Sequence, residues 1–411
     1  MKLAVLCPHF EPDLAPTGEV ISRIVGELVD RGHRLDIVTA LPWYRTHRVE
    51  PGFEGRLVRT ERTHWGSITR VHPFPTDKRS ISRRAIAFAG FSGLAGFAGL
   101  RGGRVDGVLA MSPPLSLGLT GWAMSLARRG PYVFNIQDVF PDVAVELGAI
   151  TNKTVISAAR RLEAVSYRVA DAITVLSEDL RENVASKVRP VDRGKVRVIP
   201  NFVDTEAVRP LDRVTPYRRE LGIGDETVVM YAGNVGFSQS FDVVLEAAHR
   251  LVGERVTFVI NGGGSALADV ERRAGGLSNM RFAAYQPRER LAEVLATGDI
   301  HVVPLKRGLA RSSVPSKTYS ILAAARPVVA SVDVGTEVAR VVANAGAGLA
   351  VPPEDPDAFT QALLRLIDTP DEARRMGEAG RRFVEGWASP SAVAAAYEAL
   401  FSELAKGRAK G

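Results

Sequence analysis

The sequence predicts an α/β protein of two doubly wound domains, and three observations lead to this prediction. Its 411 residues exceed the length of one ordinary domain. Short apolar runs alternate with amphipathic helical patterns, which is typical of parallel sheets. A second alternating series begins near residue 228. We therefore expect domains at residues 1–200 and 217–386, a hinge at 201–216, and a final helix with a basic tail at 387–411.

Composition places the chain among globular proteins of a reducing compartment. Apolar residues make up 45% of the chain and charged residues 24%, which is typical of a globular fold. The single cysteine, Cys7, excludes an internal disulfide and lies in the first apolar run, so we expect a buried thiol. This run is too short for the apolar core of a signal peptide, so we expect a cytoplasmic protein.

Positive charge is concentrated in one part of the first domain. The formal net charge is +7. Residues 44–84 contain ten Lys and Arg against four Asp and Glu, an excess of +6. Such asymmetry indicates an anionic partner. Because no base-stacking motif or DNA-reading helix accompanies the charge, we expect no nucleic acid partner. An anionic membrane surface or a diphosphate fits better.

The first domain begins with a strand, a helix and a second strand. An apolar run ends at Pro8, and the helix from Gly18 to Arg31 carries its apolar residues on one face. This order of elements is the unit of a doubly wound sheet. The strands expected in this domain are residues 3–6, 35–39, 108–111, 132–137, 172–176 and 196–199.

Two carboxylates follow the strand at residues 132–137. Asp138 and Asp142 stand beyond its carboxyl end, where ligands bind in open α/β sheets. An alternative is that either residue caps a helix. We take Asp138 as the candidate functional residue.

Residues 85–100 form a run of apolar and small residues. These sixteen residues fall short of the roughly 20 that a spanning helix needs. Arginines flank the run on both sides, so two interpretations stay open: a buried helix of the first domain, or a helix that lies along a membrane interface. The next strand follows almost at once, which favours the buried helix.

The second domain repeats the alternation of strands and helices. The glycines at 262–264 follow a strand and let the backbone turn tightly and approach a ligand. After Val329 the sequence predicts helices. The expected strands are residues 228–232, 258–261, 281–285, 301–304 and 328–329, with a helix at 241–251.

The stretch from Arg311 to Ala330 predicts the start of a helix that binds an anion. Pro315 fits a first helical turn because its missing N–H would find no partner there, and Ser316 can cap a free amide. Arg311 and Lys317 add charge to the partial positive charge of a helix N-terminus, so we expect a phosphate-bearing ligand. An ordinary surface loop and helix would explain the same residues.

Several segments resemble family-4 retaining glycosyltransferases of the GT-B fold. The segment PSKTYSILAAARPVVA, which starts at Pro315, resembles the signature helix of that family. RGHRLDIVT, DVFPD and PNFVD, which start at Arg31, Asp138 and Pro200, resemble further elements of it. The spelling GNVGFSQ at 233–239 is similar to the branch that acts on bacterial surface polysaccharides, the L-fucosamine transferase-like enzymes.

The resemblance implies how the donor diphosphate is bound. Gly18 takes the place of a glycine that lets backbone amides approach the donor phosphates. Asn234 and Gln239 stand where the broad family has an Arg and a Lys, and Ser312 and Ser320 where it has two glutamates. Amide side chains donate hydrogen bonds but bring no charge. The candidates for the missing positive charge are Arg311, Lys317, Lys306 and Arg307.

The resemblance also implies the remaining site residues. Gly262 and Gly263 form the loop that approaches the donor, and the nucleotide base binds near Gln286. Catalysis is assigned to Lys317, which stabilises the leaving group, and to Asp138. The donor-binding set is completed by Arg311, Ser316 and Ser320.

The activity implied is the transfer of a sugar from a nucleotide-diphosphate donor, held by the second domain. The acceptor is a glycan or a polyprenyl-diphosphate-linked sugar, held by the first domain, in cell-envelope or exopolysaccharide synthesis. Basic residues and helix dipoles neutralise the leaving diphosphate, and the sequence has no metal-ligand cluster, so we expect neither metal nor cofactor. The basic segment favours peripheral attachment to the inner face of the membrane. A sugar-nucleotide epimerase and a non-catalytic binding partner stay open as alternatives.

Overall fold

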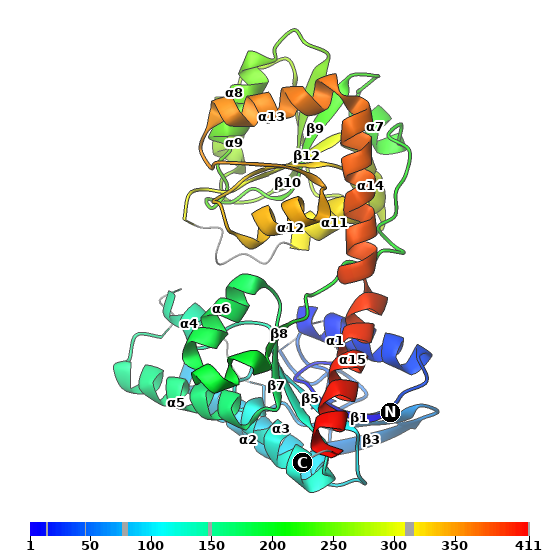
Figure 1. The fold of residues 1–411 in the computed structure, drawn as a ribbon, viewed down its shortest axis with the longest axis vertical. Helices are drawn as coiled ribbons and strands as arrows, with labels where there is room; N and C mark the ends of the chain where they lie inside the picture. Colours follow the sequence, from blue (N-terminus) through cyan, green and yellow to red (C-terminus); the bar gives the residue numbers. More distant parts are fainter. Residues whose placement is uncertain (14, 46, 76–80, 147–149, 309–315, 410–411) are drawn as a thin grey trace. The chain divides into compact units, whose positions relative to one another are not determined.

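The computed structural model describes residues 1–411 except 14, 46, 76–80, 147–149, 309–315 and 410–411. The chain folds into two compact units, each built on its own sheet (Figure 1). Unit 1 contains residues 1–201 and 393–411, and unit 2 contains residues 202–392. The predicted class, two doubly wound α/β domains, is confirmed.

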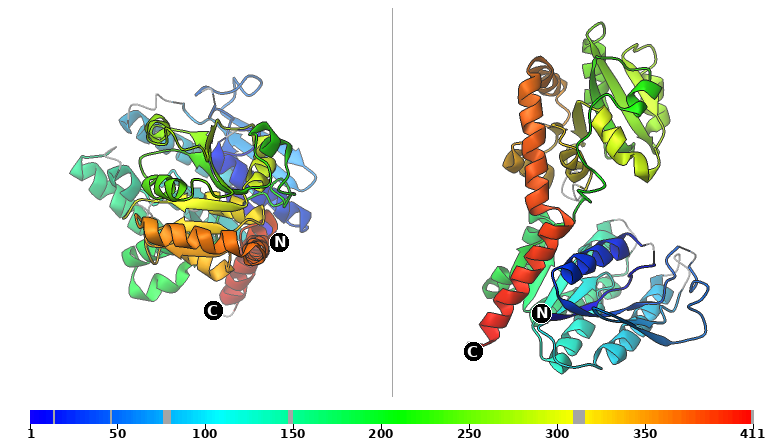
Figure 2. Two further views of the ribbon diagram at one scale, coloured as in Figure 1. Left: turned by 90° about the horizontal axis from the view of Figure 1, so that it is seen from above. Right: turned by 90° about the vertical axis from the view of Figure 1, so that its right-hand side faces the viewer.

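Unit 1 is organised around an eight-stranded sheet with helices on both faces (Figure 2). Its strands are β1 (Lys2–Leu6), β2 (Arg34–Ala40), β3 (Val58–Thr63), β4 (Gly66–Val71), β5 (Gly107–Ser112), β6 (Tyr132–Ile136), β7 (Ala172–Val175) and β8 (Val196–Val198). They lie in the order β3-β4-β2-β1-β5-β6-β7-β8, all parallel except the antiparallel pair β3 and β4. Strands β5, β6 and β7 are buried along their whole length, as covered parallel strands are.

The helices of unit 1 connect these strands and cover the sheet. They are α1 (Pro16–Asp30), α2 (Ile81–Gly99), α3 (Leu117–Arg128), α4 (Asp142–Glu146), α5 (Lys153–Val169) and α6 (Glu178–Lys187), with a short 3-10 helix at Pro190–Lys195. The α1 helix buries Ile21, Ile24, Val25 and Leu28, the apolar face that its spacing predicts.

The hairpin β3–β4, which the sequence did not predict, uses part of the basic segment within the fold. Arg70 on β4 is 2% exposed, and its Nη2 donates to the carbonyl oxygen of Glu11 at 2.6 Å. The Nε of Arg70 and the Nε of Arg59 lie 3.4 Å and 3.3 Å from the same carboxylate oxygen of Glu61. These two positive charges therefore serve the hairpin rather than an external partner.

The apolar run at 85–100 lies in α2 up to Gly99 and is divided between the core and the surface. Ala87, Phe91 and Ala95 are buried in the unit 1 core, as the buried-helix interpretation expects. Ile86 and Phe97 are 73% and 55% exposed. Of the flanking arginines, the guanidinium carbon of Arg101 lies over the Phe97 ring, 4.1 Å from its centroid.

Unit 2 contains a six-stranded, fully parallel sheet in the order β11-β10-β9-β12-β13-β14. The strands are β9 (Thr227–Asn234), β10 (Val256–Gly263), β11 (Met280–Ala283), β12 (Ile300–Pro304), β13 (Val328–Ser331) and β14 (Gly348–Val351). The helices are α7 (Pro216–Glu220), α8 (Asp242–Arg250), α9 (Leu267–Arg273), α10 (Leu291–Thr297), α11 (Ser316–Ala323), α12 (Glu337–Ala345), α13 (Pro356–Asp368) and α14 (Pro370–Trp387), with a 3-10 turn at Arg288–Arg290.

One expectation about unit 2 needs correction. The prediction of helices only after Val329 is wrong, because β14 pairs in parallel with β13. This strand is four residues long and only partly buried, so its sequence gives a weak strand pattern. Residues 202–216, which belong to the hinge predicted at 201–216, group with unit 2, and Val203 and Val208 are buried in its core.

The last helix, α15 (Pro390–Ala409), belongs to unit 1 from Val393 onward. Asn135 on β6 donates from Nδ2 to the hydroxyl of Tyr397 at 2.9 Å in a buried contact. Phe401 packs against Gly107, where an added Cβ would lie 2.3 Å from the ring. The chain thus crosses back to the first domain, as the resemblance implies.

Unit 2 depends on a buried cation in α7. Arg218 is 1% exposed and donates to the carbonyl oxygens of Gly224 at 2.9 Å and Thr297 at 3.0 Å. Its Nη1 also lies 3.2 Å from Asp299. We expect Arg218→Leu to lower the free energy of unfolding by about 3 kcal/mol, because it leaves buried acceptors unpaired. Urea denaturation measures this loss. Arg219→Leu, an exposed neighbour in the same helix, should change it by less than about 0.5 kcal/mol; equal losses would refute the assignment.

Candidate functional site

The candidate site is a pocket of about 220 Å³ in unit 2. It lies where chain order reverses beside β9, with β10 on one side and β12 on the other, the position at which ligands bind in open α/β sheets. Its lining brings together three predicted residues, Gln286, Lys317 and Ser320. Gly233 on β9 and Asn261 on β10 line it as well.

Lys317 stands in the first turn of α11 and supplies a cation to this pocket. Its Nζ donates to the hydroxyl of Tyr231 at 3.3 Å and lies 5.3 Å from the centroid of that ring. The side chain as a whole stays exposed, but loss of water around the ammonium lowers the pKa of Lys317. A cation held at a helix N-terminus attracts an anionic ligand, phosphate above all.

Tyr231 on β9 fixes the position of this lysine. Its hydroxyl donates to the carbonyl oxygen of Asn234 at 2.5 Å, and its ring packs edge-on against Phe241 at 4.9 Å. Burial raises the pKa of Tyr231, so the phenol stays neutral and accepts the hydrogen bond from Lys317. The sequence analysis missed Tyr231, which reads as one more apolar residue of a buried strand.

Two glycines allow close approaches at or beside the pocket: Gly233 lines it, and Gly262 lies next to Gly233 but outside the lining. A Cβ added at Gly233 would lie 2.5 Å from the Nζ of Lys317. A Cβ added at Gly262 would lie 1.9 Å from the carbonyl oxygen of Gly233, its register partner across β9 and β10. Gly262 is therefore required by strand packing, whatever ligand the loop approaches.

After β11, Tyr285 and Gln286 contribute a wall of the pocket. Tyr285 is 58% exposed and donates from its hydroxyl to the carbonyl oxygen of Gly263 at 3.2 Å. Gln286 is tied into the wall, since its Nε2 donates to the carbonyl oxygen of Ala284 at 3.2 Å. An exposed aromatic face beside amide groups suits a nucleobase, which combines a flat ring with polar edges.

The other predicted residues of unit 2 lie outside the lining of this pocket. Gln239 closes the turn after β9: its Oε1 accepts from the amide of Gly236 at 2.8 Å and its Nε2 donates to the hydroxyl of Ser238 at 2.9 Å. Asn234 is exposed at the end of β9. Arg311 and the side chain of Ser316 lie outside the described residues.

Gly18 and Asp138, predicted to join the site, belong to unit 1. Gly18 is buried in α1, and a Cβ there would lie 3.0 Å from the carbonyl oxygen of Asp13, so it lets the loop after β1 rest on the helix. Asp138 is exposed beyond β6, and partial desolvation raises its pKa. Asp142, by contrast, is paired with Lys187 at 2.6 Å.

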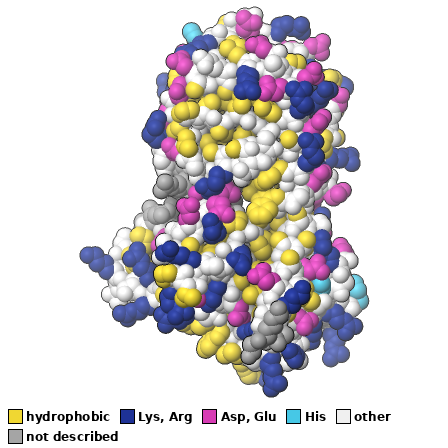
Figure 3. Space-filling view, in the orientation of Figure 1, with side chains coloured by type: hydrophobic (Ala, Val, Ile, Leu, Met, Phe, Trp, Pro, Cys, Tyr) yellow, Lys and Arg dark blue, Asp and Glu magenta, His cyan; other side chains and the backbone are white. Residues whose placement is uncertain are grey.

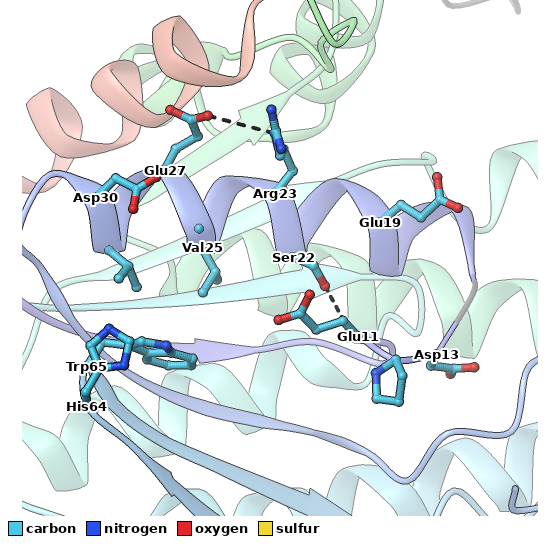
Figure 4. A pocket seen from close by; sticks show the side chains of 13 residues that line it. Glu11, Asp13, Glu19, Ser22, Arg23, Val25, Glu27, Asp30, His64 and Trp65 are labelled. Carbon is cyan, nitrogen blue, oxygen red and sulfur yellow. Dashed lines mark hydrogen bonds and ion pairs between the residues drawn. The ribbon is translucent and has the colours of Figure 1, made fainter. Parts of the chain in front are cut away.

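A larger hollow, of about 560 Å³, runs beside α1 in unit 1 (Figure 4). The amide of Glu11 donates to the hydroxyl of Ser22 at 2.9 Å, and Arg23 lies 3.8 Å from Glu27. Its acidic lining consists of Glu11, Asp13, Glu19, Glu27 and Asp30. Carboxylates in this number repel an anionic ligand, so the smaller pocket of unit 2 is the better candidate for phosphate.

The described residues contain neither a cluster of metal ligands nor a membrane-spanning helix. Among them, no three His, Cys, Asp or Glu side chains come together in a way that could hold a metal ion. In the same part of the chain, none of the helices has the length and apolar content needed to cross a bilayer.

Comparison with known families decides the identity of the fold. Residues 17–201 match the model of the glycosyl transferase 4-like domain, and residues 226–369 match that of glycosyl transferases group 1. The chain is a family-4 glycosyltransferase of the GT-B fold. It is 27% identical over 385 residues to the Escherichia coli K12 protein named as colanic acid biosynthesis glycosyl transferase WcaI, covering 90% of this chain and 93% of that protein.

Solved structures share the architecture at low identity. Sucrose-phosphate synthase of Thermosynechococcus elongatus superposes with a TM-score of 0.66 at 18% identity, covering 98% of this glycosyltransferase and 99% of the synthase. HepE of Anabaena, solved in complex with UDP, gives a TM-score of 0.64 at 14% identity, covering 98% of this chain and 100% of HepE. At such identities these two similarities concern the fold.

The packing role of Gly262 can be tested apart from ligand binding. We expect Gly262→Ala to lower the free energy of unfolding by about 2 kcal/mol or more, because the new methyl group would collide with a backbone oxygen of β9. Gly276→Ala is the control: its φ is also positive, at +94°, but a Cβ there meets no atom within 4 Å. Thermal unfolding of the two variants should therefore distinguish the effect of backbone strain, which both share, from the effect of the collision, which only Gly262→Ala has. Equal shifts in Tm for the two variants would contradict our interpretation.

Proposed function

We propose that this glycosyltransferase moves a sugar from a nucleotide-diphosphate donor, bound by unit 2, to an acceptor glycan or lipid-linked sugar, bound by unit 1, in the synthesis of a cell-envelope or extracellular polysaccharide. The observation that carries the proposal is Lys317, a partly desolvated cation at a helix N-terminus in the unit 2 pocket. The similarity to WcaI over 90% of the chain supports a polysaccharide product.

The donor is a nucleotide diphosphate whose base lies at the Tyr285–Gln286 wall and whose phosphates face Lys317. Tyr285, Gln286 and Lys317 line the same pocket, which supports that placement of the donor. We favour UDP as the nucleotide, because HepE, of the same fold, binds it. Ser320 contributes a hydroxyl to the donor where the broad family has a glutamate.

The reaction breaks the bond between the sugar C1 and the diphosphate oxygen and forms a bond between C1 and an acceptor oxygen. We propose retention by attack from the same face, with the acceptor proton passing to the leaving diphosphate. The described lining of the unit 2 pocket includes no Asp, Glu or His, which disfavours a covalent intermediate there and also an epimerase, which needs acid and base groups. Lys317 and the amides of α11 stabilise the leaving charge, and Asp138 is the acceptor-side candidate.

Lys317→Ala should lower turnover about a hundredfold or more, because roughly 3 kcal/mol of transition-state stabilisation is lost. Release of nucleotide diphosphate from a panel of labelled nucleotide sugars measures this effect. Arg255→Ala is the matched control, since Arg255 is exposed in unit 2 just before β10 begins, away from the carboxyl ends of the strands. A fall of less than about fivefold in folded protein would rule out Lys317 as the phosphate contact.

We also propose that unit 1 attaches peripherally to an anionic membrane surface. In the basic segment 44–84, Arg79 lies outside the described residues, and so do the side chains of Arg83 and Arg84. The helix α5 supports attachment instead. Figure 3 shows Lys and Arg side chains gathered over this part of unit 1. The exposed cations of α5 are Lys153, Arg160, Arg161 and Arg168, and Val155 and Val165 are exposed beside them.

Each Lys or Arg near an anionic bilayer contributes about 1 kcal/mol, and salt screens this attraction. The triple variant Arg160→Glu, Arg161→Glu, Arg168→Glu should therefore abolish co-sedimentation with phosphatidylglycerol vesicles at low salt. A matched triple variant in unit 2, Arg255→Glu, Arg375→Glu, Arg382→Glu, changes the same charge on exposed residues and should leave binding intact. Equal binding of the native protein to neutral vesicles would refute membrane attachment through charge.

A further inference from the structure

A second pocket, of about 420 Å³, lies in unit 1 at the carboxyl ends of β1, β2, β4 and β5. Chain order in the unit 1 sheet reverses beside β1, which has β2 on one side and β5 on the other. This is the topological counterpart of the unit 2 site. Most of its wall is aromatic or proline, including Trp43, Tyr44, Phe74, Phe88 and Phe91.

The imidazole of His9 is a polar group in this wall. The Nδ1 of His9 lies 2.6 Å from Oδ2 of Asp13, and the side chains of the two residues are 12% and 0% exposed. His9 stacks on Trp43 with 5.8 Å between ring centroids, and meets Tyr44 edge-on at 5.2 Å. Three contacts thus hold the ring in one orientation.

Asp13 determines which nitrogen of His9 carries the proton. Its other oxygen, Oδ1, accepts from the amides of Trp43 at 3.3 Å and Tyr44 at 3.0 Å. A carboxylate that accepts on both oxygens requires a proton on Nδ1 of His9, and in the tautomer with its single proton on Nδ1 the ring presents Nε2 as an acceptor. Among the described residues, Nε2 has no hydrogen-bond partner. It lies on the ring edge turned away from Asp13, in a residue that lines the pocket.

The pocket therefore offers a hydrogen-bond acceptor within a largely apolar enclosure. A pyranose ring combines hydroxyl donors on its edge with C–H groups on its face, and such a face packs well on aromatic rings. A deoxy sugar that carries a methyl group in place of the hydroxymethyl group places one fewer unpaired hydroxyl against the prolines and phenylalanines.

We propose that this pocket binds the acceptor sugar, that His9 Nε2 accepts a hydrogen bond from one of its hydroxyls, and that the aromatic wall selects deoxy sugars. The inference rests on the proposed function, since it takes unit 1 to hold the acceptor. His9 is then a specificity-determining contact, and Asp13 a positioning residue that acts through it.

Trp43 provides a direct readout, because it lies in the wall and is one of only four tryptophans in the chain. The full chain is titrated with methyl α-L-rhamnopyranoside and with its 6-hydroxy counterpart, methyl α-L-mannopyranoside, while tryptophan fluorescence is followed. We expect saturable quenching with a lower Kd for the rhamnoside. Trp43→Phe should remove the signal. Farnesyl phosphate and inorganic phosphate serve as the hydrocarbon and anion probes.

Two substitutions of His9 separate the roles of its nitrogens. In His9→Asn the amide nitrogen replaces Nδ1 and can still donate to Asp13, but nothing replaces Nε2, so the Kd for the rhamnoside should rise at least tenfold. In His9→Gln the longer amide reaches the Nε2 position, and the Kd should stay within about threefold. Asp13→Asn turns the hydrogen bond to Nδ1 around, so that Nε2 becomes a donor, and should raise the Kd at least tenfold in protein of native Tm.

Quenching by farnesyl phosphate alone, no response to either glycoside, or an unchanged Kd in His9→Asn would each overturn the proposal. Binding of UDP, measured by thermal shift in the same proteins, should be unaffected by all three substitutions. Absence of UDP binding in the native protein would contradict the proposed donor instead, and the glycoside titration would still report on the unit 1 pocket.

Discussion

The constraint on which both units depend is that parallel strands bring all their carboxyl ends to one edge of a sheet. Where chain order reverses, the connections on either side of one strand leave in opposite directions and a crevice remains. In unit 1 that strand is β1 and in unit 2 it is β9. The two pockets with the clearest chemistry lie at these two places. Because each sheet keeps its central strands buried, the side chains at the crevice are presented on a rigid base.

Sequence reasoning recovered the buried strands because covered parallel strands are apolar throughout, and a run such as Val108–Met111 has few other interpretations. It missed the hairpin β3–β4, whose exposed strand Val58–Thr63 is polar at most positions. It also missed β14, which is short and half-exposed. Pattern alone is a weak guide to strands of these two kinds.

The candidate site was predicted in part. Lys317, Gln286 and Ser320 do share a pocket, and a segment resemblance was enough to suggest them. Tyr231, Tyr285 and Asn261 were missed because their contacts depend on strand register, which one sequence does not reveal. Gln239 is the opposite case: it was predicted to contact the donor, but in the structure its side chain closes a local turn. The net charge of residues 44–84 was also a poor guide to a partner-binding surface, because it does not show which charges are buried. Arg70 counts toward the basic segment but is buried beside Glu61.

The carboxylate of Asp13 is hydrogen-bonded to the loop after β2 through the backbone amides of residues 43 and 44. Every amino acid except proline supplies such an amide. The side chains at these two positions can therefore vary through evolution while the connection between the two loops is kept. The path of the two loops is therefore independent of the side chains at positions 43 and 44, which are free to change the chemistry of the pocket wall while the backbone connection stays the same.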